Sequence, residues 1–131
     1  MKTISLAPNA PSPIAAYSQA TISNGLIFCA GQIALAPENT TQLIPGGIKE
    51  QTDQVMKNLA AVLAAAGSSW KSVLMTSTFL VDLSNSKLVN EIYGGYINLE
   101  APPARQTLGV NALPMGALVE ISVIAAVEGS A

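Results

Sequence analysis

The hydrophobic pattern changes its period several times along the chain, and each change marks an expected element. Apolar residues alternate or run together over residues 17–22 and 26–34, on either side of Ser-Asn-Gly at 23–25. Such a turn between two strand-like runs is typical of a β-hairpin. Residues 7–16 are rich in proline and alanine and are expected to be extended, whereas residues 35–47 are rich in turn-forming residues and are expected to form a loop.

A helical period begins at Ile48. Apolar residues recur there at intervals of three and four as far as Ala66, and Gly67 supplies a natural stop. Residues 73–81 contain valine, threonine, phenylalanine and leucine, which are typical of a strand. Ser84 could cap a second helix that runs to about residue 97.

Two further strands are expected at 105–111 and 117–127, after the helix-ending prolines at 102–103. The resulting order is β-β-α-β-α-β-β. This order predicts an α+β sandwich, in which a mixed sheet carries two helices on one face. At 131 residues, the chain is expected to form a single domain over residues 1–131.

The composition bears on assembly. Half of the residues are hydrophobic and only 11% are charged, against roughly 25% in an average soluble domain. A sheet with helices on one face also leaves its other face to be covered. Both observations favour a homo-oligomer, although a thinly charged monomer is an alternative.

Charge and residue usage narrow the function classes. The net charge is −2 and the six basic residues are scattered, so nucleic acid is not expected to be a main partner. The chain has no histidine, which removes the commonest general base and zinc ligand, and no metal site is expected. Its single cysteine, Cys29, excludes an intrachain disulfide. No apolar run is suited to span a bilayer, so we expect a soluble, cytoplasmic protein.

Two charged residues stand out in the last third of the chain. Glu120 interrupts an otherwise apolar strand, and an isolated buried carboxylate requires a partner, a shifted pKa or a function. Arg105 carries a planar cation whose fork matches a carboxylate. Together they suggest a pocket that holds a small acid and moves protons or water beside it. Taken singly, each could instead belong to a structural ion pair.

Several short segments, in this order and spacing, resemble the reactive intermediate deaminase family (RidA, also called YjgF-like). They are residues 16–20 (AYSQA), 30–33 (AGQI), 50–55 (EQTDQV), 58–59 (NL), 65–67 (AAG), 89–93 (VNEIY), 103–105 (PAR), 113–114 (LP) and 117–121 (ALVEI). The resemblance implies a chorismate-mutase-like α+β sandwich that assembles as a homotrimeric barrel with pockets between subunits.

The implied activity is hydrolysis of enamines and imines, such as 2-aminoacrylate, to 2-keto acids and ammonia. This reaction would protect pyridoxal-phosphate enzymes and would need no metal or organic cofactor. By the same resemblance, six residues have site roles: Arg105 binds the substrate carboxylate, Glu120 positions water, Tyr17 lines the pocket, Gly31 contributes backbone, Thr107 follows the arginine by two positions, and Asn90 lies near the rim.

The sequence departs from the family pattern at a few positions. Alanines replace the usual Gly-Pro at 15–16 and a common serine at Ala30, and Gln106 replaces a serine. These changes bear on substrate range more than on reaction type. Two other functions stay open: a non-catalytic trimer that binds or senses keto acids, and a protein- or RNA-interaction module that regulates translation. Tyr17 could also be a packing aromatic, Thr107 a strand former and Asn90 a helix-surface residue.

Overall fold

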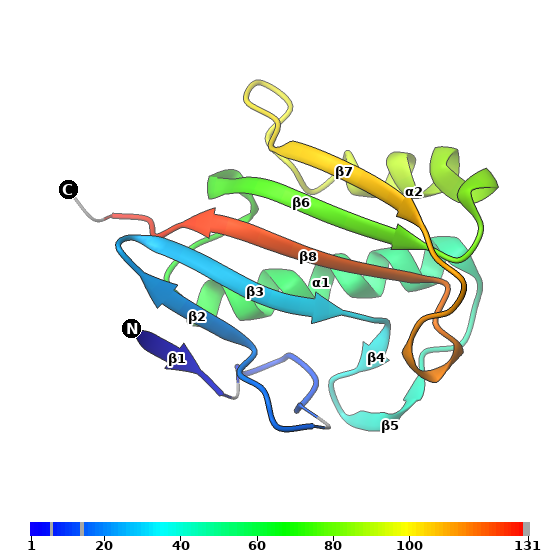
Figure 1. Ribbon diagram of the computed structural model, residues 1–131, viewed down its shortest axis with the longest axis horizontal. Helices are drawn as coiled ribbons and strands as arrows, with labels where there is room; N and C mark the ends of the chain where they lie inside the picture. The colour runs from blue at the N-terminus through cyan, green and yellow to red at the C-terminus, as the bar shows by residue number, and fades with distance from the viewer. Residues whose placement is uncertain (6, 14, 130–131) are drawn as a thin grey trace.

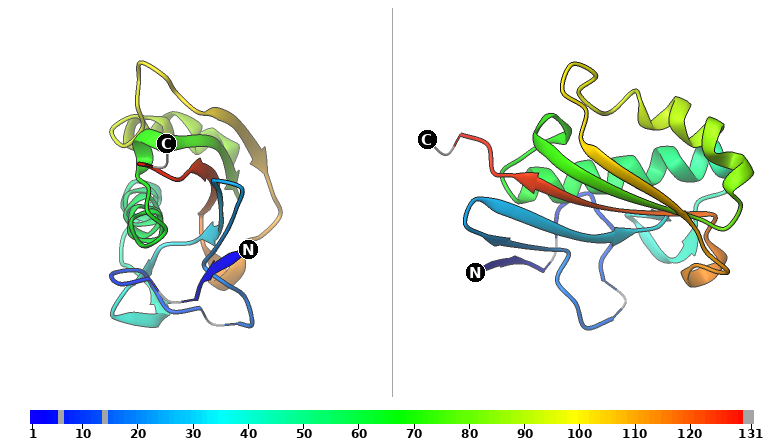
Figure 2. Two further views of the ribbon diagram at one scale, coloured as in Figure 1. Left: turned by 90° about the vertical axis from the view of Figure 1, so that its left-hand side faces the viewer. Right: turned by 45° about the horizontal axis from the view of Figure 1, so that its top comes forward.

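The computed structural model describes residues 1–5, 7–13 and 15–129, which form a curved mixed sheet with two α-helices on one face (Figure 1; Figure 2, left). In spatial order the six strands are β1 (Lys2–Ile4), β2 (Ala20–Ser23), β3 (Leu26–Gln32), β8 (Val119–Ala126), β6 (Val73–Leu80) and β7 (Ala104–Gly109). Only β6 and β7 pair in parallel. The predicted α+β class and the one-sided placement of the helices are confirmed.

Helix α1 (Ile48–Ala65) forms the centre of the core and packs on β3 and β8. The Glu50 side chain accepts a hydrogen bond of 2.8 Å from the Gly47 amide and so closes the first turn. Gly67, with φ of 84°, ends the helix as expected, because the left-handed conformation costs glycine little. No helix in the described part of the chain is long and apolar enough to cross a membrane.

The two faces of the sheet differ in what covers them. Along β8, Val119, Ile121, Val123 and Ala125 are buried on the helix side, and the residues between them point to the open face. Neither α-helix covers that open face (Figure 2, left). It carries apolar side chains such as Phe28 and Leu108, which are 43% and 47% exposed.

Two elements were missed by the sequence prediction. The short edge strand β1 pairs with β2, and the region expected as a loop contains the hairpin β4 (Leu35–Ala36) and β5 (Asn39–Leu43). Both are short and rich in polar residues, so they show little hydrophobic alternation. Their strand conformation depends on pairing with a neighbour rather than on local propensity.

The chain before β2 also differs from expectation. Residues 8–10 and 15–16 form turns and bends instead of an extended segment, with Asn9 at a φ of 66°. The buried amide of Gln19 accepts a hydrogen bond from Ala7 N and donates one of 2.6 Å to Pro11 O. These two hydrogen bonds fix the segment before Gln19 in a conformation that does not pair with β3. Strand β2 therefore begins at Ala20 rather than at Tyr17.

The second helix is shorter than predicted. Ser84 does not cap it: Asp82 accepts a hydrogen bond of 2.9 Å from Ser84 N and starts a 3-10 turn over Leu83–Asn85. Helix α2 (Ser86–Tyr93) follows and ends at Tyr93, directly before Gly94 and Gly95. The consecutive glycines that follow weaken further helical turns, which explains the early end.

Candidate active site

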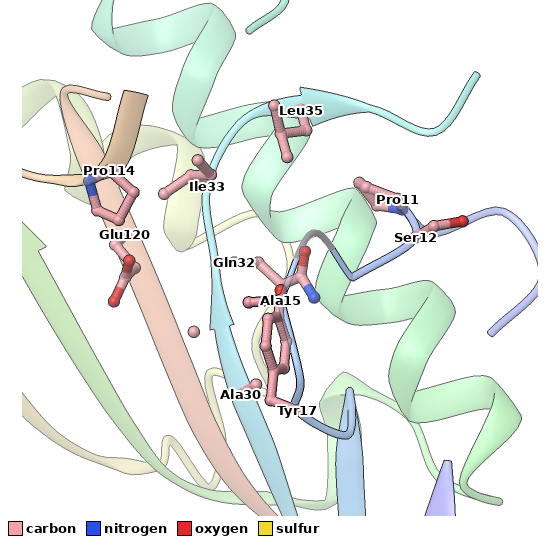
Figure 3. A pocket seen from close by; sticks show the side chains of 11 residues that line it. Pro11, Ser12, Ala15, Tyr17, Ala30, Gln32, Ile33, Leu35, Pro114 and Glu120 are labelled. Atoms are coloured by element: carbon pink, nitrogen blue, oxygen red, sulfur yellow. The ribbon is translucent and has the colours of Figure 1, made fainter. Parts of the chain in front are cut away.

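A pocket of about 410 Å³ opens where β3 and β8 lie side by side (Figure 3). The bent segment before β2 forms one wall, and the loop before β8 contributes Pro114. The described residues that line it are Pro11, Ser12, Ala15, Tyr17, Ala30, Gly31, Gln32, Ile33, Leu35, Pro114 and Glu120. Three of the six predicted site residues, Tyr17, Gly31 and Glu120, therefore lie together.

Glu120 is the acidic side chain among the described residues that line the pocket. It occupies an outward position of β8, between buried Val119 and Ile121. In the described part of the chain, its carboxylate takes part in no ion pair and no hydrogen bond. Partial burial without a compensating partner raises the pKa of Glu120 above its ordinary value of 4.5. A rise in this direction means that Glu120 holds its proton to a higher pH than an exposed glutamate does, which suits a group that exchanges protons with a ligand.

Gly31 lies directly against this carboxylate. The register of β3 against β8 shifts between Cys29 and Gln32, and this irregularity contains Gly31. A Cβ atom at position 31 would lie 2.7 Å from Oε2 of Glu120, well inside van der Waals contact. Any larger residue at position 31 would therefore displace the Glu120 carboxylate, whereas glycine lets it stay and leaves the main chain open to a ligand.

Tyr17 contributes an accessible aromatic wall. Its side chain is 45% exposed and stands beside Ala15 and Ala30 (Figure 3). With a hydroxyl at one end and an apolar ring, Tyr17 can pack against a hydrocarbon group while its polar tip stays hydrated. The small alanines next to it leave room at this wall.

Buried amide side chains hold the walls of the pocket, and sequence analysis gave them no role. Asn58, fully buried on α1, donates hydrogen bonds of 3.1 and 3.0 Å to the carbonyls of Ile33 and Leu35. Gln51, about two turns before Asn58 on the same buried side of α1, accepts a hydrogen bond of 2.9 Å from Leu118 N, just before β8. The sequence does contain a sign of this role. Gln51 and Asn58 are polar residues on the otherwise apolar side of α1, and a buried polar side chain needs a hydrogen-bond partner.

Arg105 lies elsewhere. It is partly buried on β7, and its register partner on β6 is Thr76, whose side chain bonds to Tyr93 of α2. The guanidinium carbon lies 4.1 Å from the centroid of the Tyr93 ring. Arg105 therefore faces the helix side of the sheet and is absent from the lining of the pocket. Within one chain, the expected pairing of Arg105 and Glu120 in a single pocket does not occur.

The remaining two predicted residues also lie away from the pocket. Thr107 is partly buried on β7 and pairs in register with Thr78, on the same side as Arg105. Asn90 is exposed on α2, and its carbonyl accepts a hydrogen bond from Gly94 N. Neither lines the space beside Glu120. A single chain thus presents one group of predicted residues around Glu120 and the others along β7 and α2.

Other reactive side chains do not add to the pocket. Cys29 faces the core, and burial raises the pKa of its thiol to about 12, which keeps it protonated and inert at neutral pH. In the described part of the chain, no group of three or more Cys, Asp or Glu side chains is placed to hold a metal ion. Among the described residues that line the pocket, Glu120 is the one with a carboxyl group.

Comparison with known proteins shows the family of the chain. The family model described as endoribonuclease L-PSP matches residues 7–127. The chain belongs to this family, the Rid proteins. A RutC family protein of Synechocystis is 44% identical over 125 residues, which cover 95% of each chain. The similarity between this Rid protein and its relative therefore extends over nearly the whole chain.

Two further matches have more specific names. The 2-iminobutanoate/2-iminopropanoate deaminase of Rattus norvegicus is 42% identical over 116 residues, which cover 88% of this chain and 83% of the rat protein. The crystal structure of RidA from an Antarctic Psychrobacter species superposes with a TM-score of 0.89 at 36% identity, over 96% of this chain and 99% of that one. The Rid fold and family membership are thus established.

Proposed function

We propose that this Rid protein hydrolyses reactive enamines and imines of 2-amino acids, such as 2-aminoacrylate, to 2-keto acids and ammonia. The observation that carries the proposal is the carboxyl of Glu120, which has a raised pKa and no hydrogen-bond or ion-pair partner among the described residues. It lies against the main chain of Gly31 in a largely apolar pocket. A relative named as a 2-iminobutanoate/2-iminopropanoate deaminase supports the same reaction.

The reaction requires proton transfer and the delivery of a water molecule to the imine carbon. Protonation of the enamine carbon gives the imine, water adds to the imine carbon, and the resulting carbinolamine expels ammonia and leaves the keto acid. In its protonated form Glu120 can supply a proton, and in its ionised form it can orient and deprotonate the attacking water. The main chain at Gly31 is accessible for a hydrogen bond to the substrate.

The substrate carboxylate is assigned to Arg105, supplied by a neighbouring subunit of a homotrimer. Three features support this assignment: Arg105 lies outside the pocket of its own chain, it occupies the edge strand β7, and it has no ion pair with a described residue. The exposed apolar open face of the sheet supports self-association. Thr107 on β7 and Asn90 on α2 would complete the part of the site that the neighbouring subunit contributes.

Location of the protein in the cytoplasm stays a prediction.

A keto-acid binder without catalysis would use Arg105 equally well. The raised pKa of Glu120 favours the enzyme, because binding alone needs no tuned proton donor. The family description names an endoribonuclease, yet the net charge of −2 and the scattered basic residues offer RNA no electrostatic surface. A translation-regulating interaction module has no specific observation in its favour.

The deciding experiment uses a pyridoxal-phosphate dehydratase that releases 2-aminoacrylate from serine. Semicarbazide competes for the imine, and pyruvate formation is timed with and without this protein. We expect faster pyruvate formation and less semicarbazone with wild-type protein, and neither effect with Glu120→Gln. An unchanged time course with wild-type protein would refute the proposal, and pyruvate binding measured in parallel would then identify a binder.

A further inference from the structure

The surroundings of Arg105 are unusual for a cation on a thinly charged protein. Its guanidinium lies over the ring of Tyr93, 4.1 Å from the centroid, and Tyr93 is only 4% exposed. The Nε atom is buried without a hydrogen-bond partner in the part of the chain that the structure describes. The two ion pairs found there, Lys49–Glu91 and Lys57–Asp53, do not involve Arg105. An aromatic face is thus its main described contact.

Tyr93 is itself held from two sides. Its hydroxyl shares a hydrogen bond of 2.9 Å with Thr76 Oγ1 on β6. Its ring packs on Trp70 in a T-shaped arrangement, with centroids 6.5 Å apart and ring planes inclined by 76°. Trp70 in turn donates a hydrogen bond of 3.1 Å from Nε1 to Met56 O on α1. The aromatic face is therefore fixed to both the sheet and the main helix of the core.

We propose that Tyr93 is a positioning residue that holds the Arg105 guanidinium in place for a substrate carboxylate without neutralising its charge. The inference rests on the proposed function, since it assigns the carboxylate to Arg105. An Asp or Glu in the place of Tyr93 would also hold the guanidinium, but it would compete with the substrate for the same N–H groups. A ring attracts the cation through its quadrupole and leaves the N–H donors uncommitted.

The primary test compares Tyr93→Leu with Tyr93→Phe. Leucine removes the aromatic face, whereas phenylalanine keeps it and loses only the hydroxyl. We expect Tyr93→Leu to weaken pyruvate binding, measured by calorimetry, about tenfold, and Tyr93→Phe to change it by less than about threefold. The KM for an imino acid should rise in parallel in Tyr93→Leu while kcat stays within about threefold, because Tyr93 acts only through carboxylate binding.

Tyr96→Leu is the matched control. Tyr96 also packs on Trp70, with centroids 6.4 Å apart, but it has no described contact with Arg105. A general loosening of the aromatic cluster would weaken pyruvate binding in both leucine variants, whereas the proposal requires the loss only at position 93. The affinity for pyruvate relative to the uncharged pyruvamide should fall in Tyr93→Leu alone.

Folding is monitored by circular dichroism. If Tyr93→Leu does not fold, phenylalanines of increasing fluorine content at position 93 replace it, since fluorine withdraws charge from the ring face with little change of shape. Pyruvate affinity should then fall with each added fluorine. Unchanged affinity across that series, equal loss in Tyr96→Leu, or a fall in kcat alone would overturn the inference. Wild-type protein that binds pyruvate but does not deaminate would refute the proposed reaction and leave this test intact.

Discussion

Arg105 and Glu120 project from opposite faces of the same sheet. Arg105 pairs in register with Thr76, on the helix side, whereas Glu120 pairs with Phe79 and faces the open side. Strands β7 and β8 flank β6, so the two backbone positions lie roughly 10 Å apart across the sheet and roughly 10 Å apart along it. A site that uses both side chains therefore requires a second copy of the chain.

This relationship predicts complementation between two inactive variants. Arg105→Ala lacks the proposed carboxylate anchor, and Glu120→Gln lacks the proposed proton-transfer group. If each site takes Arg105 from one subunit and Glu120 from the next, random co-assembly should give about one quarter of the sites both native residues. We expect about a quarter of wild-type activity from co-expressed variants, and almost none from either variant alone.

The assembly itself is checked on the same samples. Light scattering should give about three times the chain mass of 13.4 kDa. A stable monomer at micromolar concentration, or activity in the mixture no higher than in either parent, would argue against a site shared between subunits. As a further control, mixing two preparations of Arg105→Ala should restore nothing.

Gly31→Ala should damage activity without unfolding the protein. The added Cβ would lie 2.7 Å from Oε2 and 2.9 Å from Cδ of Glu120, and the flexible carboxylate end would move rather than the backbone. We expect kcat/KM to fall at least about tenfold because the carboxylate leaves its working position. Steady-state deamination kinetics measure the loss of activity, and a thermal melt shows whether the variant is still folded.

Gly47→Ala is a suitable control for that substitution. Its added methyl group would lie 3.8 Å from the nearest Glu50 atom, which is ordinary contact. Activity in this variant should stay close to that of the wild type. Full activity in Gly31→Ala would mean that the position of the Glu120 carboxylate does not matter for turnover.

Glu120→Gln should change stability in a pH-dependent way. Burial raises the pKa of Glu120 in the folded state above its ordinary value of 4.5, so the folded chain holds this proton more tightly than the unfolded chain. The contribution of the protonated group is fully present below 4.5 and is lost as pH rises through the folded-state pKa. The variant, neutral at every pH, should match the wild type at low pH and exceed its stability at neutral pH.

Urea unfolding between about pH 4 and pH 8 measures this difference. Exposed Glu100→Gln controls for the loss of one surface charge and should show a smaller change with pH. A stability difference between Glu120→Gln and the wild type that is the same at both ends of the range would contradict the raised pKa.

Asn58→Leu should destabilise the pocket wall. The substitution removes the donor of two buried hydrogen bonds, to the carbonyls of Ile33 and Leu35. The Ile33 carbonyl keeps a hydrogen bond of 2.9 Å from Leu35 N, so the larger cost falls on the Leu35 carbonyl, since a buried group that loses its partner costs about 1–3 kcal/mol. We expect the free energy of unfolding to fall by about 2–4 kcal/mol. Thr41→Ala, which removes an exposed local hydrogen bond to Asn39, should cost less than about 0.5 kcal/mol. Equal costs would show that the Asn58 amide is not holding this wall.

Substrate size and charge should also matter. Apart from Glu120, no charged side chain of the described chain lines the pocket, and Ala15, Ala30, Ile33 and Leu35 are apolar. A second substrate carboxylate would lose its hydration there without gaining a cation. An amino-acid oxidase can supply imines from leucine, methionine and glutamate in parallel. We expect deamination of the glutamate-derived imine to be slower by at least about tenfold, or about 1.4 kcal/mol. Equal rates for leucine and glutamate would contradict this description of the pocket.

Local sequence patterns were sufficient to predict the main helix and most strands of the large sheet. The period of the apolar residues from Ile48 to Ala66 predicted α1, and Gly67 marked its end, because side-chain spacing and backbone conformation are properties of a few neighbouring residues. Glu120 was identifiable as a charge out of place in a strand for the same reason. By contrast, β1 and the β4–β5 hairpin were missed, since pairing with distant segments stabilises them.

The sequence by itself thus determined the α+β class, the main helix and the identity of the unusual carboxylate. Only the tertiary structure decided that Tyr17 and Gly31 lie with Glu120 in one pocket, while Arg105 lies against Tyr93 on the opposite face. The physical reason is that these relationships depend on strand order and register, which bring residues tens of positions apart into contact. A shift of register by one residue would turn the Glu120 side chain toward the core, and no local pattern around residue 120 records which strand lies beside it.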